Sequence, residues 1–391
     1  MKKLFPFTAA VLLFGLIAFR ARAGFSSIYV FGDSISATAT NNATGSATNY
    51  YYGKRYCNGR SWVEVLAQRQ GLGANSITNV NWNYSSNNVS FYGQYSPTLV
   101  TNVNKFIAPS NATNCLFVVW VCNADFVGDM NDPNIGAPNN SFHGTNLVAW
   151  TNAINQHLAN HFTAITNLYA KGCRALIAPN AADITTVPEF NNQNTNYSAF
   201  VRQQIIRFNT NYTAMLRQIV AGLPDLKIYV PDIFTLLDNI LTNAAAYGLT
   251  NAAYDQGTGN GSEPIDAIDA FGYGILPNAN PNGPGTNYIF WDPLGDPSAK
   301  LQEIVADVTQ QLLAPPQFSG ISYLNGTNQL NLTNAPVGLN GLVLSLTNLA
   351  TANWTTNLNF TATNPTQTIS VSATNQQQFY RLNFPFAWTW P

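Results

Sequence analysis

The chain has 391 residues, of which 46% are hydrophobic and only 9% are charged, and its formal net charge is −1. Soluble domains usually carry about 25% charged residues, so hydrogen-bonding neutral side chains must cover much of this surface. Without an excess of basic side chains the chain gives nucleic acid or anionic lipid nothing to bind, and we expect neither as a partner.

Residues 1–23 have the pattern of a secretory signal peptide. Lysines at positions 2 and 3 precede an apolar stretch over residues 4–19, and Ala-Arg-Ala at residues 21–23 is typical of a cleavage site. The apolar stretch is short for a membrane span, and no later segment is apolar enough to be one. We therefore expect a mature chain without a transmembrane segment, secreted, periplasmic or at the cell surface. Its net charge would be about −5, from 13 basic and 18 acidic side chains.

Residues 24–314 alternate between strand and helix patterns. Short apolar runs predict strands at residues 28–31, 80–84, 116–121, 175–178 and 227–230. A capping box from Ser61 to Glu64 predicts a helix that ends near Gly71. Two longer helices are predicted from apolar positions at helical spacing: Trp150, Ile154, Leu158, Phe162, Ile165 and Leu168 in one, and Val201, Ile205, Phe208, Tyr212, Leu216 and Ile219 in the other. Strands that alternate with long helices indicate a parallel sheet covered on both faces.

The first predicted strand ends in the stretch "SSIYVFGDSISATA". Gly32 permits a tight turn directly after the strand, and this turn holds Ser34 at the carboxyl edge of the sheet. Open α/β sheets bind their ligands at that edge. Ser34 is therefore either a nucleophile or a turn residue, and the residues around it must decide between the two.

Residues 317–391 have a different character, with Arg381 as their one charged side chain. Helical periodicity gives way to strand alternation, and Asn325-Gly326 is typical of a two-residue hairpin turn. We predict a small β-sandwich-like module here. It either serves attachment, export or glycan contact, or is a passive appendage.

The four cysteines are Cys57, Cys115, Cys122 and Cys173. An exported protein can pair four cysteines in three ways. Three of these residues, however, lie in or beside apolar strand-like runs, which favours buried free thiols. The absence of a Cys-x-x-Cys motif argues against a zinc or thioredoxin-type site, and we expect neither a metal nor a cofactor.

Five stretches follow one another in the chain: "FGDSIS", "RYCNGRSWVEVLAQRQGL", "NWNYSSNNVS", "VVWVCNADF" and "YIFWDPLGDPSAKLQEIVAD". In this order they resemble the GDSL-type (SGNH) esterases and lipases, the secreted bacterial members especially, over residues 24–314. The resemblance implies a flavodoxin-like three-layer α/β/α fold. It also implies hydrolysis of acyl esters, in lipids, acetylated glycans or small molecules, through a serine acyl-enzyme.

The resemblance assigns catalytic roles to Ser34 as nucleophile and Asp292 as triad acid. It implies three oxyanion donors: the backbone N–H of Ser34, the backbone N–H of Asn88 where the family has glycine, and the side chain of Asn123. The match at Asn123 is displaced, because alignment on the following aspartate places the family's asparagine at Ala124. Loss of such a donor typically lowers the rate by about 10²–10³.

The triad histidine is missing from its expected place. Where the family has Asp-x-x-His-Pro, residues 292–297 read Asp-Pro-Leu-Gly-Asp-Pro. Counting forward from Asp292 puts Gly295 at the histidine, whereas counting back from Pro297 puts Asp296 there. Asp296 is also expected to be the N-cap of the final helix, with Pro297 in its first turn.

Three histidines lie elsewhere. His143 follows the fourth stretch in a loop on the catalytic edge, where it could replace the missing base, as could an aspartate. His157 and His161 are one helical turn apart, and we expect them at a solvated helix edge. Two hypotheses result: a GDSL-type ester hydrolase with an altered base, or a catalytically impaired protein of this fold that binds an extracellular ligand or glycan.

Overall fold

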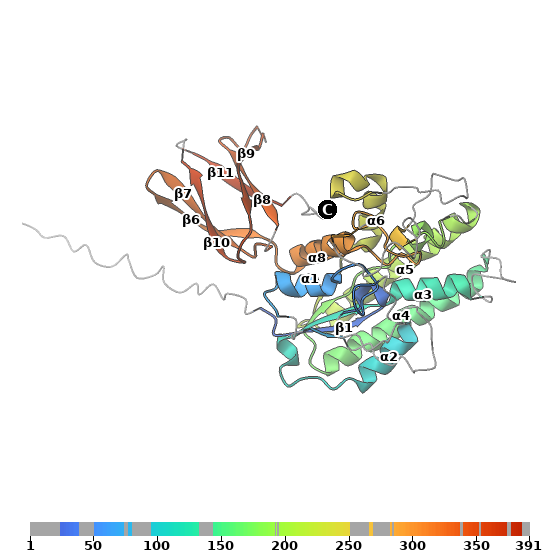
Figure 1. Ribbon diagram of the computed structural model, residues 1–391. Coiled ribbons are helices and arrows are strands. Elements are labelled where there is room, and N and C mark those ends of the chain that lie inside the picture. Colours follow the sequence, from blue (N-terminus) through green and yellow to red (C-terminus); the bar gives the residue numbers. More distant parts are fainter. Residues whose placement is uncertain are drawn as a thin grey trace, which may run out of the picture.

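The structure is a computed structural model that describes residues 24–38, 51–73, 77–79, 95–132, 144–191, 193, 195–250, 266–268, 282–283, 285–336, 339–351, 353–373 and 377–384. The predicted signal segment, Asn88 and His143 lie outside these residues. A five-stranded parallel sheet forms the centre of the body (Figure 1). Its strands are β1 (Ile28–Gly32), β2 (Ile77–Asn79), β3 (Leu116–Trp120), β4 (Ala175–Ile177) and β5 (Lys227–Tyr229).

The strand order is β2-β1-β3-β4-β5, which is the flavodoxin-like order. Successive strands are added on one side of β1 first and on its other side from β3 onward. The loops that follow β1 and β3 therefore run in opposite directions and leave a crevice at the carboxyl ends of these two strands. The predicted strands at residues 28–31, 116–121, 175–178 and 227–230 are confirmed. Strand β2 directly precedes the predicted strand at residues 80–84, which lies outside the described residues.

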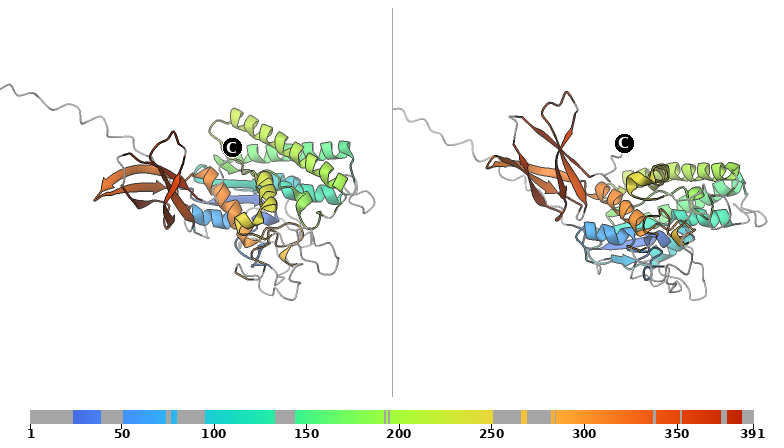
Figure 2. Two further views of the ribbon diagram at one scale, coloured as in Figure 1. Left: turned by 90° about the horizontal axis from the view of Figure 1, so that it is seen from above. Right: turned by 45° about the horizontal axis from the view of Figure 1, so that its top comes forward.

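Helices cover both faces of the sheet, as Figures 1 and 2 show. Helices α1 (Trp62–Arg69) and α8 (Ala299–Leu313) pack together on one face, and α4 (Leu147–Ala170) packs between α2 (Ser96–Lys105) and α5 (Thr195–Gly222) on the other. Two shorter helices, α3 (Cys122–Asn131) and α6 (Ile233–Thr242), follow β3 and β5. This three-layer α/β arrangement is the predicted fold.

The helix signals were local and mostly correct. Ser61 and Glu64 form the predicted capping box of α1, and Gly71 follows the helix with a φ of 73°. All six predicted apolar positions of α5 are buried. In α4 the buried stripe is rotated from the prediction, because Phe162 is 41% exposed while His157 and His161 are buried.

Six further strands form two three-stranded antiparallel sheets, which lie beside the helical body at the left of Figure 1. One has the order β10-β7-β6, from β6 (Gln317–Leu324), β7 (Thr327–Thr333) and β10 (Gln367–Ser372); the other has β11-β8-β9, from β8 (Asn340–Leu346), β9 (Thr355–Thr361) and β11 (Phe379–Asn383). The predicted hairpin joins β6 to β7, where Asn325 and Gly326 both have positive φ. Both sheets contribute to one hydrophobic cluster of their own, including Leu330, Val343 and Ile369. The division of the chain near residues 315–316 stays a prediction.

All four cysteines are buried free thiols, as the apolar runs predicted for Cys115, Cys122 and Cys173. Burial raises the pKa of the Cys57 and Cys173 thiols to about 12, so these thiols stay protonated. Within the described part of the chain, no helix combines the length and the apolar character needed to cross a membrane.

Candidate active site

Ser34 begins a 3-10 turn, η1 (Ser34–Ser36), immediately after β1. Only glycine fits at Gly32, because a Cβ there would lie 2.5 Å from the Cβ of Ser36. The Asp33 carboxylate caps the turn by accepting a hydrogen bond from the backbone N–H of Ile35 at 3.2 Å. This tight turn holds Ser34 half-buried at the carboxyl end of β1, beside the crevice between β1 and β3.

Asp33 is a buried support for this turn. Burial raises the pKa of its carboxyl to about 7, although hydrogen bonds from the backbone N–H groups of Ile35 and Ala124 oppose the shift. These bonds tie the turn after β1 to the start of α3. Ser34 is therefore held between two strand ends.

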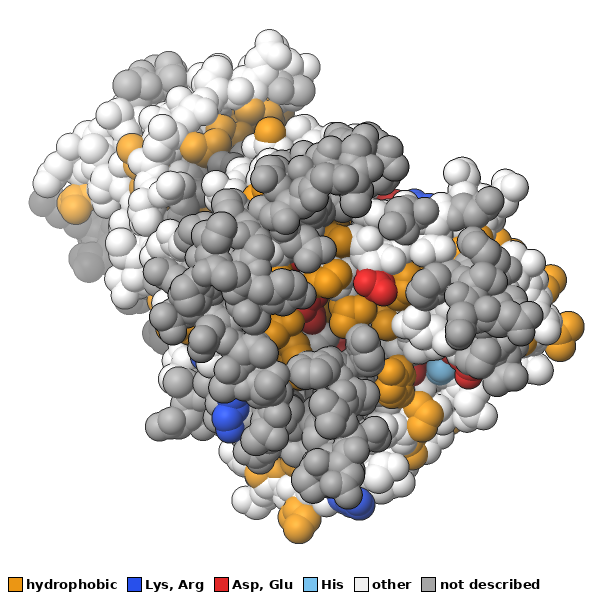
Figure 3. All heavy atoms as spheres, turned by 45° about the vertical axis from the view of Figure 1, so that its right-hand side comes forward, with side chains coloured by type: hydrophobic (Ala, Val, Ile, Leu, Met, Phe, Trp, Pro, Cys, Tyr) orange, Lys and Arg blue, Asp and Glu red, His pale blue; other side chains and the backbone are white. Residues whose placement is uncertain are grey.

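An apolar pocket opens at Ser34 and holds about 790 Å³ of empty space, part of it open to solvent. Helices α6 and α8 contribute hydrophobic side chains to its walls: Ile233, Leu236, Leu237 and Ile240 from the first, Leu301 and Val305 from the second. Ser34, Asn123 and Asp296 also line it. On the face in Figure 3, hydrophobic side chains surround acidic ones in a hollow. The pocket therefore combines a long apolar wall with a small polar end.

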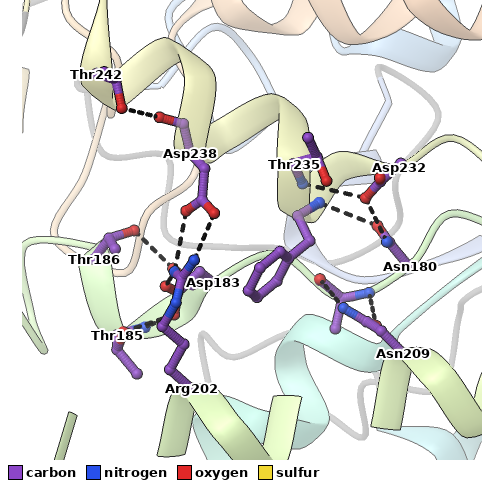
Figure 4. Close-up of polar contacts among 12 residues, drawn as sticks. Asn180, Asp183, Thr185, Thr186, Arg202, Asn209, Asp232, Thr235, Asp238 and Thr242 are labelled. Carbon is purple, nitrogen blue, oxygen red and sulfur yellow. Dashed lines mark hydrogen bonds and ion pairs between the residues drawn. The ribbon is translucent and has the colours of Figure 1, made fainter. Parts of the chain in front are cut away.

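Arg202 of α5 joins two walls of this pocket (Figure 4). Its guanidinium donates to the fully buried Asp183, which precedes the pocket-lining turn η5 (Ile184–Thr186), and also to both carboxylate oxygens of Asp238 in α6, at 3.0 and 2.6 Å. The Asp183 carboxylate also accepts from the Thr185 backbone N–H at 3.1 Å. A planar guanidinium suits this two-sided contact, which fixes η5 relative to α6.

Asparagines hold the start of α6 and the loop after β4. The Asn180 side chain accepts from the backbone N–H of Ile233 at 2.7 Å and donates to Asp232. Asn209 makes two bonds with the backbone of Ala181, both at 2.9 Å, as Figure 4 also shows. The segment "APNAADITTVP" is thereby fixed at the pocket wall.

Asp296, rather than Asp292, faces Ser34. Asp296 lines the pocket and receives a hydrogen bond from the Ser34 side chain. Asp292 lies behind it: its Oδ1 accepts from the backbone N–H of Asp296 at 3.1 Å, and its Oδ2 accepts from the Tyr51 hydroxyl at 3.0 Å. The structure thus brings Ser34 and Asp292 into one cluster and adds Asp296 and Tyr51. Tyr51 carried no sequence signal, because it lies in a different part of the chain.

The prediction that Asp296 caps the final helix is wrong. The N-cap of α8 is Ser298, whose hydroxyl accepts from the backbone N–H of Leu301. Pro297 pairs instead with Phe290 in an isolated β-bridge before the helix. Ser298 takes the capping role because this bridge extends the chain through Pro297 and leaves the Asp296 carboxyl directed at Asp292 and Ser34.

Gly295 is excluded as the position of a catalytic side chain. Its φ is 87°, in the region that favours glycine, and a Cβ there would lie 2.4 Å from Cγ1 of Val187. Gly295 closes the turn that begins at Asp292, with its N–H bonded to the Asp292 carbonyl at 3.0 Å. Of the two ways of aligning the missing histidine, the geometry therefore favours Asp296.

The two carboxyl groups share a buried environment. Burial raises the pKa of Asp292 to about 6, although its hydrogen bonds with Asp296 and Tyr51 oppose this shift. Burial, together with the neighbouring charge of Asp292, raises the pKa of Asp296 well above its ordinary value. Two adjacent carboxylates cannot easily both be charged, so the proton of the pair resides on Asp296.

Asn123, predicted as an oxyanion donor, lines the same pocket as Ser34. Its Oδ1 accepts from the backbone N–H of Ala182 at 2.9 Å. Its Nδ2 is buried and interacts with the Asp33 carboxyl, whose pKa this contact lowers. A side-chain amide has two N–H groups, so one remains for the pocket beside Ser34.

The sequence model of the family described as GDSL-like Lipase/Acylhydrolase matches residues 28–309. The chain belongs to this family. Among curated proteins, the GDSL-family chain is similar to two GDSL esterase/lipases of Arabidopsis thaliana. One is 26% identical over 322 residues, covering 72% of this chain and 80% of the relative. The other is 28% identical over 162 residues, covering 38% of this chain and 42% of the relative. These matches indicate ester hydrolysis as the general activity.

Two other residues considered for this GDSL-family site, Asn88 and His143, lie outside the described residues. Their roles as oxyanion donor and substitute base stay predictions.

The expectation that His157 and His161 lie at a solvated edge is wrong. Nδ1 of His157 lies 3.1 Å from the Ser96 hydroxyl, and its Nε2 lies 3.0 Å from the Asp129 carboxylate. His161 is fully buried against the rings of Phe208 and Tyr212. Asp125 and Asp129 of α3 face this part of α4, and their carboxylates contact the His157 ring. These contacts stabilise a polar side chain at a buried position.

Proposed function

We propose that this protein is a serine hydrolase for esters with an apolar acyl group, and that Ser34 is its nucleophile. The single observation that carries the proposal is the position of Ser34, at the polar end of a pocket whose walls are otherwise hydrophobic. Such a wall favours an aliphatic acyl chain over the acetyl group of a polar glycan, since each buried methylene contributes about 0.8 kcal/mol.

In this proposal, the Ser34 hydroxyl attacks the ester carbonyl and forms an acyl-enzyme, which water then hydrolyses. The developing oxyanion is stabilised by the Ser34 backbone N–H, which stands at the first position of η1 where no helical partner exists. The Asn123 amide is the second donor, and the Asn88 backbone is the predicted third. Asp292 takes part in the group that accepts the proton of the Ser34 hydroxyl.

We also propose that the protein acts outside the cytoplasm, on the pattern of residues 1–23. This part of the proposal rests on the sequence alone.

The test is hydrolysis of p-nitrophenyl esters of increasing acyl length, together with labelling by an organophosphonate probe. We expect kcat/KM to rise about fourfold per added methylene for short chains, which is the rate equivalent of about 0.8 kcal/mol. Ser34→Ala should abolish both hydrolysis and labelling. A folded protein that neither reacts with the probe nor hydrolyses any ester would instead favour a binding protein. A preference for acetate would contradict the role of the apolar wall.

A further inference from the structure

Four side chains form a row that leads from the pocket into the protein: Ser34, Asp296, Asp292 and Tyr51. The Ser34 side chain is hydrogen-bonded to Asp296, and Asp296 is bonded to Asp292 through both its side chain and its backbone N–H. The Tyr51 hydroxyl donates to the far oxygen of Asp292 at 3.0 Å. Both carboxyl groups are only 3% exposed. Among the residues that the structure describes, no basic side chain takes part in these contacts, although a serine nucleophile needs a proton acceptor.

We propose that Asp296 is the general base that removes the Ser34 proton, and that Asp292 behind it completes a carboxyl pair in place of imidazole and carboxylate. Asp296 is the catalytic residue, because it contacts the reacting hydroxyl. Asp292 and Tyr51 are positioning residues that act through it. This inference rests on the proposed function of Ser34 as nucleophile.

The proton balance needs no further reactant. In the resting site the pair carries one proton, on Asp296, and one negative charge, on Asp292. When Ser34 Oγ bonds to the ester carbon, its proton passes to Asp296 while the Asp296 proton moves to Asp292, so both groups become neutral. As the tetrahedral intermediate collapses, Asp296 protonates the leaving alkoxide and regains its proton from Asp292. The same transfers, with water in place of serine, release the acid.

The environment supports such a pair at neutral pH. Asp292, with a pKa of about 6, accepts a proton in the same range as the imidazole it would replace, whose ordinary pKa is about 6.5. The groups that face the pair are Asp33, Tyr51 and the Cys57 thiol. Burial raises the pKa of Tyr51 far above its usual value, so this residue remains a hydrogen-bond donor. Asp33 adds repulsion that disfavours a second negative charge on the pair.

One carboxyl oxygen of Asp296 has no partner in the described part of the protein. Its Oδ1 is buried without a hydrogen bond, as are one oxygen of Asp33 and one of Asp125. Of these three carboxyl groups, those of Asp33 and Asp296 line the pocket at Ser34.

The experiment measures kcat/KM against pH for a short p-nitrophenyl ester, with the full chain and its variants. In the wild-type protein we expect activity to fall about tenfold per pH unit below about 6, as the pair becomes neutral. Asp296→Asn keeps the shape but cannot accept the proton, so activity should drop by about 10²–10⁴ and the residual rate should lose the acidic limb. Asp292→Asn should lower the rate and displace that limb.

Controls separate this inference from the proposed function. Asp129→Asn removes another buried carboxylate, one that does not line the pocket, and should leave the profile unchanged. Thermal melting verifies that each variant is folded. If Ser34→Ala abolishes activity while Asp296→Asn stays within threefold of wild type, the carboxyl pair is not the base and Ser34 remains the nucleophile. Loss of activity in His143→Ala alone would also overturn the inference. Wild-type activity that survives Ser34→Ala would refute the proposed function itself.

Discussion

The amide of Asn123 offers the sharpest test of how the pocket stabilises a transition state. Asn123→Ala removes a buried Nδ2 that also interacts with the Asp33 carboxyl, and an Oδ1 that accepts from the backbone N–H of Ala182 at 2.9 Å. If Nδ2 donates to the oxyanion, its loss should lower kcat by about 10²–10³, the usual cost of one oxyanion donor. KM should change little, because the bond strengthens only in the transition state.

The same substitution also affects stability. The N–H of Ala182 loses its acceptor inside the protein, which costs about 1–3 kcal/mol of unfolding free energy. A rate loss could therefore reflect a distorted pocket, and the chain offers a control for this. Asn209 makes two bonds of 2.9 Å to the neighbouring Ala181 but does not line the pocket. Asn209→Ala should be destabilised to a similar degree or more, yet keep its kcat.

The assays are steady-state hydrolysis of the preferred p-nitrophenyl ester and urea unfolding of both variants. Two results would refute the reasoning. One is a kcat for Asn123→Ala within threefold of wild type, which would show that the amide is not a donor. The other is an equal loss of kcat in Asn209→Ala, which would show that wall distortion, not a missing donor, lowers the rate.

Two further predictions concern stability. Arg202 is one third exposed while its partner Asp183 is fully buried, so a double-mutant cycle of Arg202→Met with Asp183→Asn should give a coupling of about 1–3 kcal/mol, discounted for solvent screening. The control is Arg207→Met, on an exposed face of the same helix, which should change the unfolding free energy by less than about 0.5 kcal/mol. A coupling energy of that size between Arg202 and Asp183 would refute the stabilising role of their contact. Burial lowers the pKa of His161 to about 4 from an ordinary 6.5. Between these two pH values the unfolded chain binds a proton at this residue and the native state does not. About 3 kcal/mol of unfolding free energy that is present above pH 6.5 is therefore lost as the pH falls towards 4. His161→Phe should remove this loss in urea unfolding across that pH range, and an unchanged slope would show that His161 is not its source.

Local patterns were enough to predict four of the five strands of the sheet and the place of the nucleophile. Strand β1, Gly32 and the turn at Ser34 are specified by adjacent residues, because an apolar run followed by glycine forms the same strand and turn wherever it lies in the sheet. The helix α5 was equally predictable, since its six apolar positions follow one period. The order of motifs along the chain indicated the family, which the match over residues 28–309 shows.

Only the tertiary structure decided which carboxyl faces Ser34. The sequence allowed Gly295 or Asp296 at the histidine position, and the choice depends on Val187, which comes from a distant loop and blocks any side chain at Gly295. Tyr51 bonds to Asp292 across 241 positions of the chain, and no spacing rule could have found this contact. In the same way, His157 is buried because its ring forms a hydrogen bond with the Asp129 carboxylate of another helix. Side chains of this kind have roles set by neighbours that are remote in sequence, and a local pattern does not contain those neighbours.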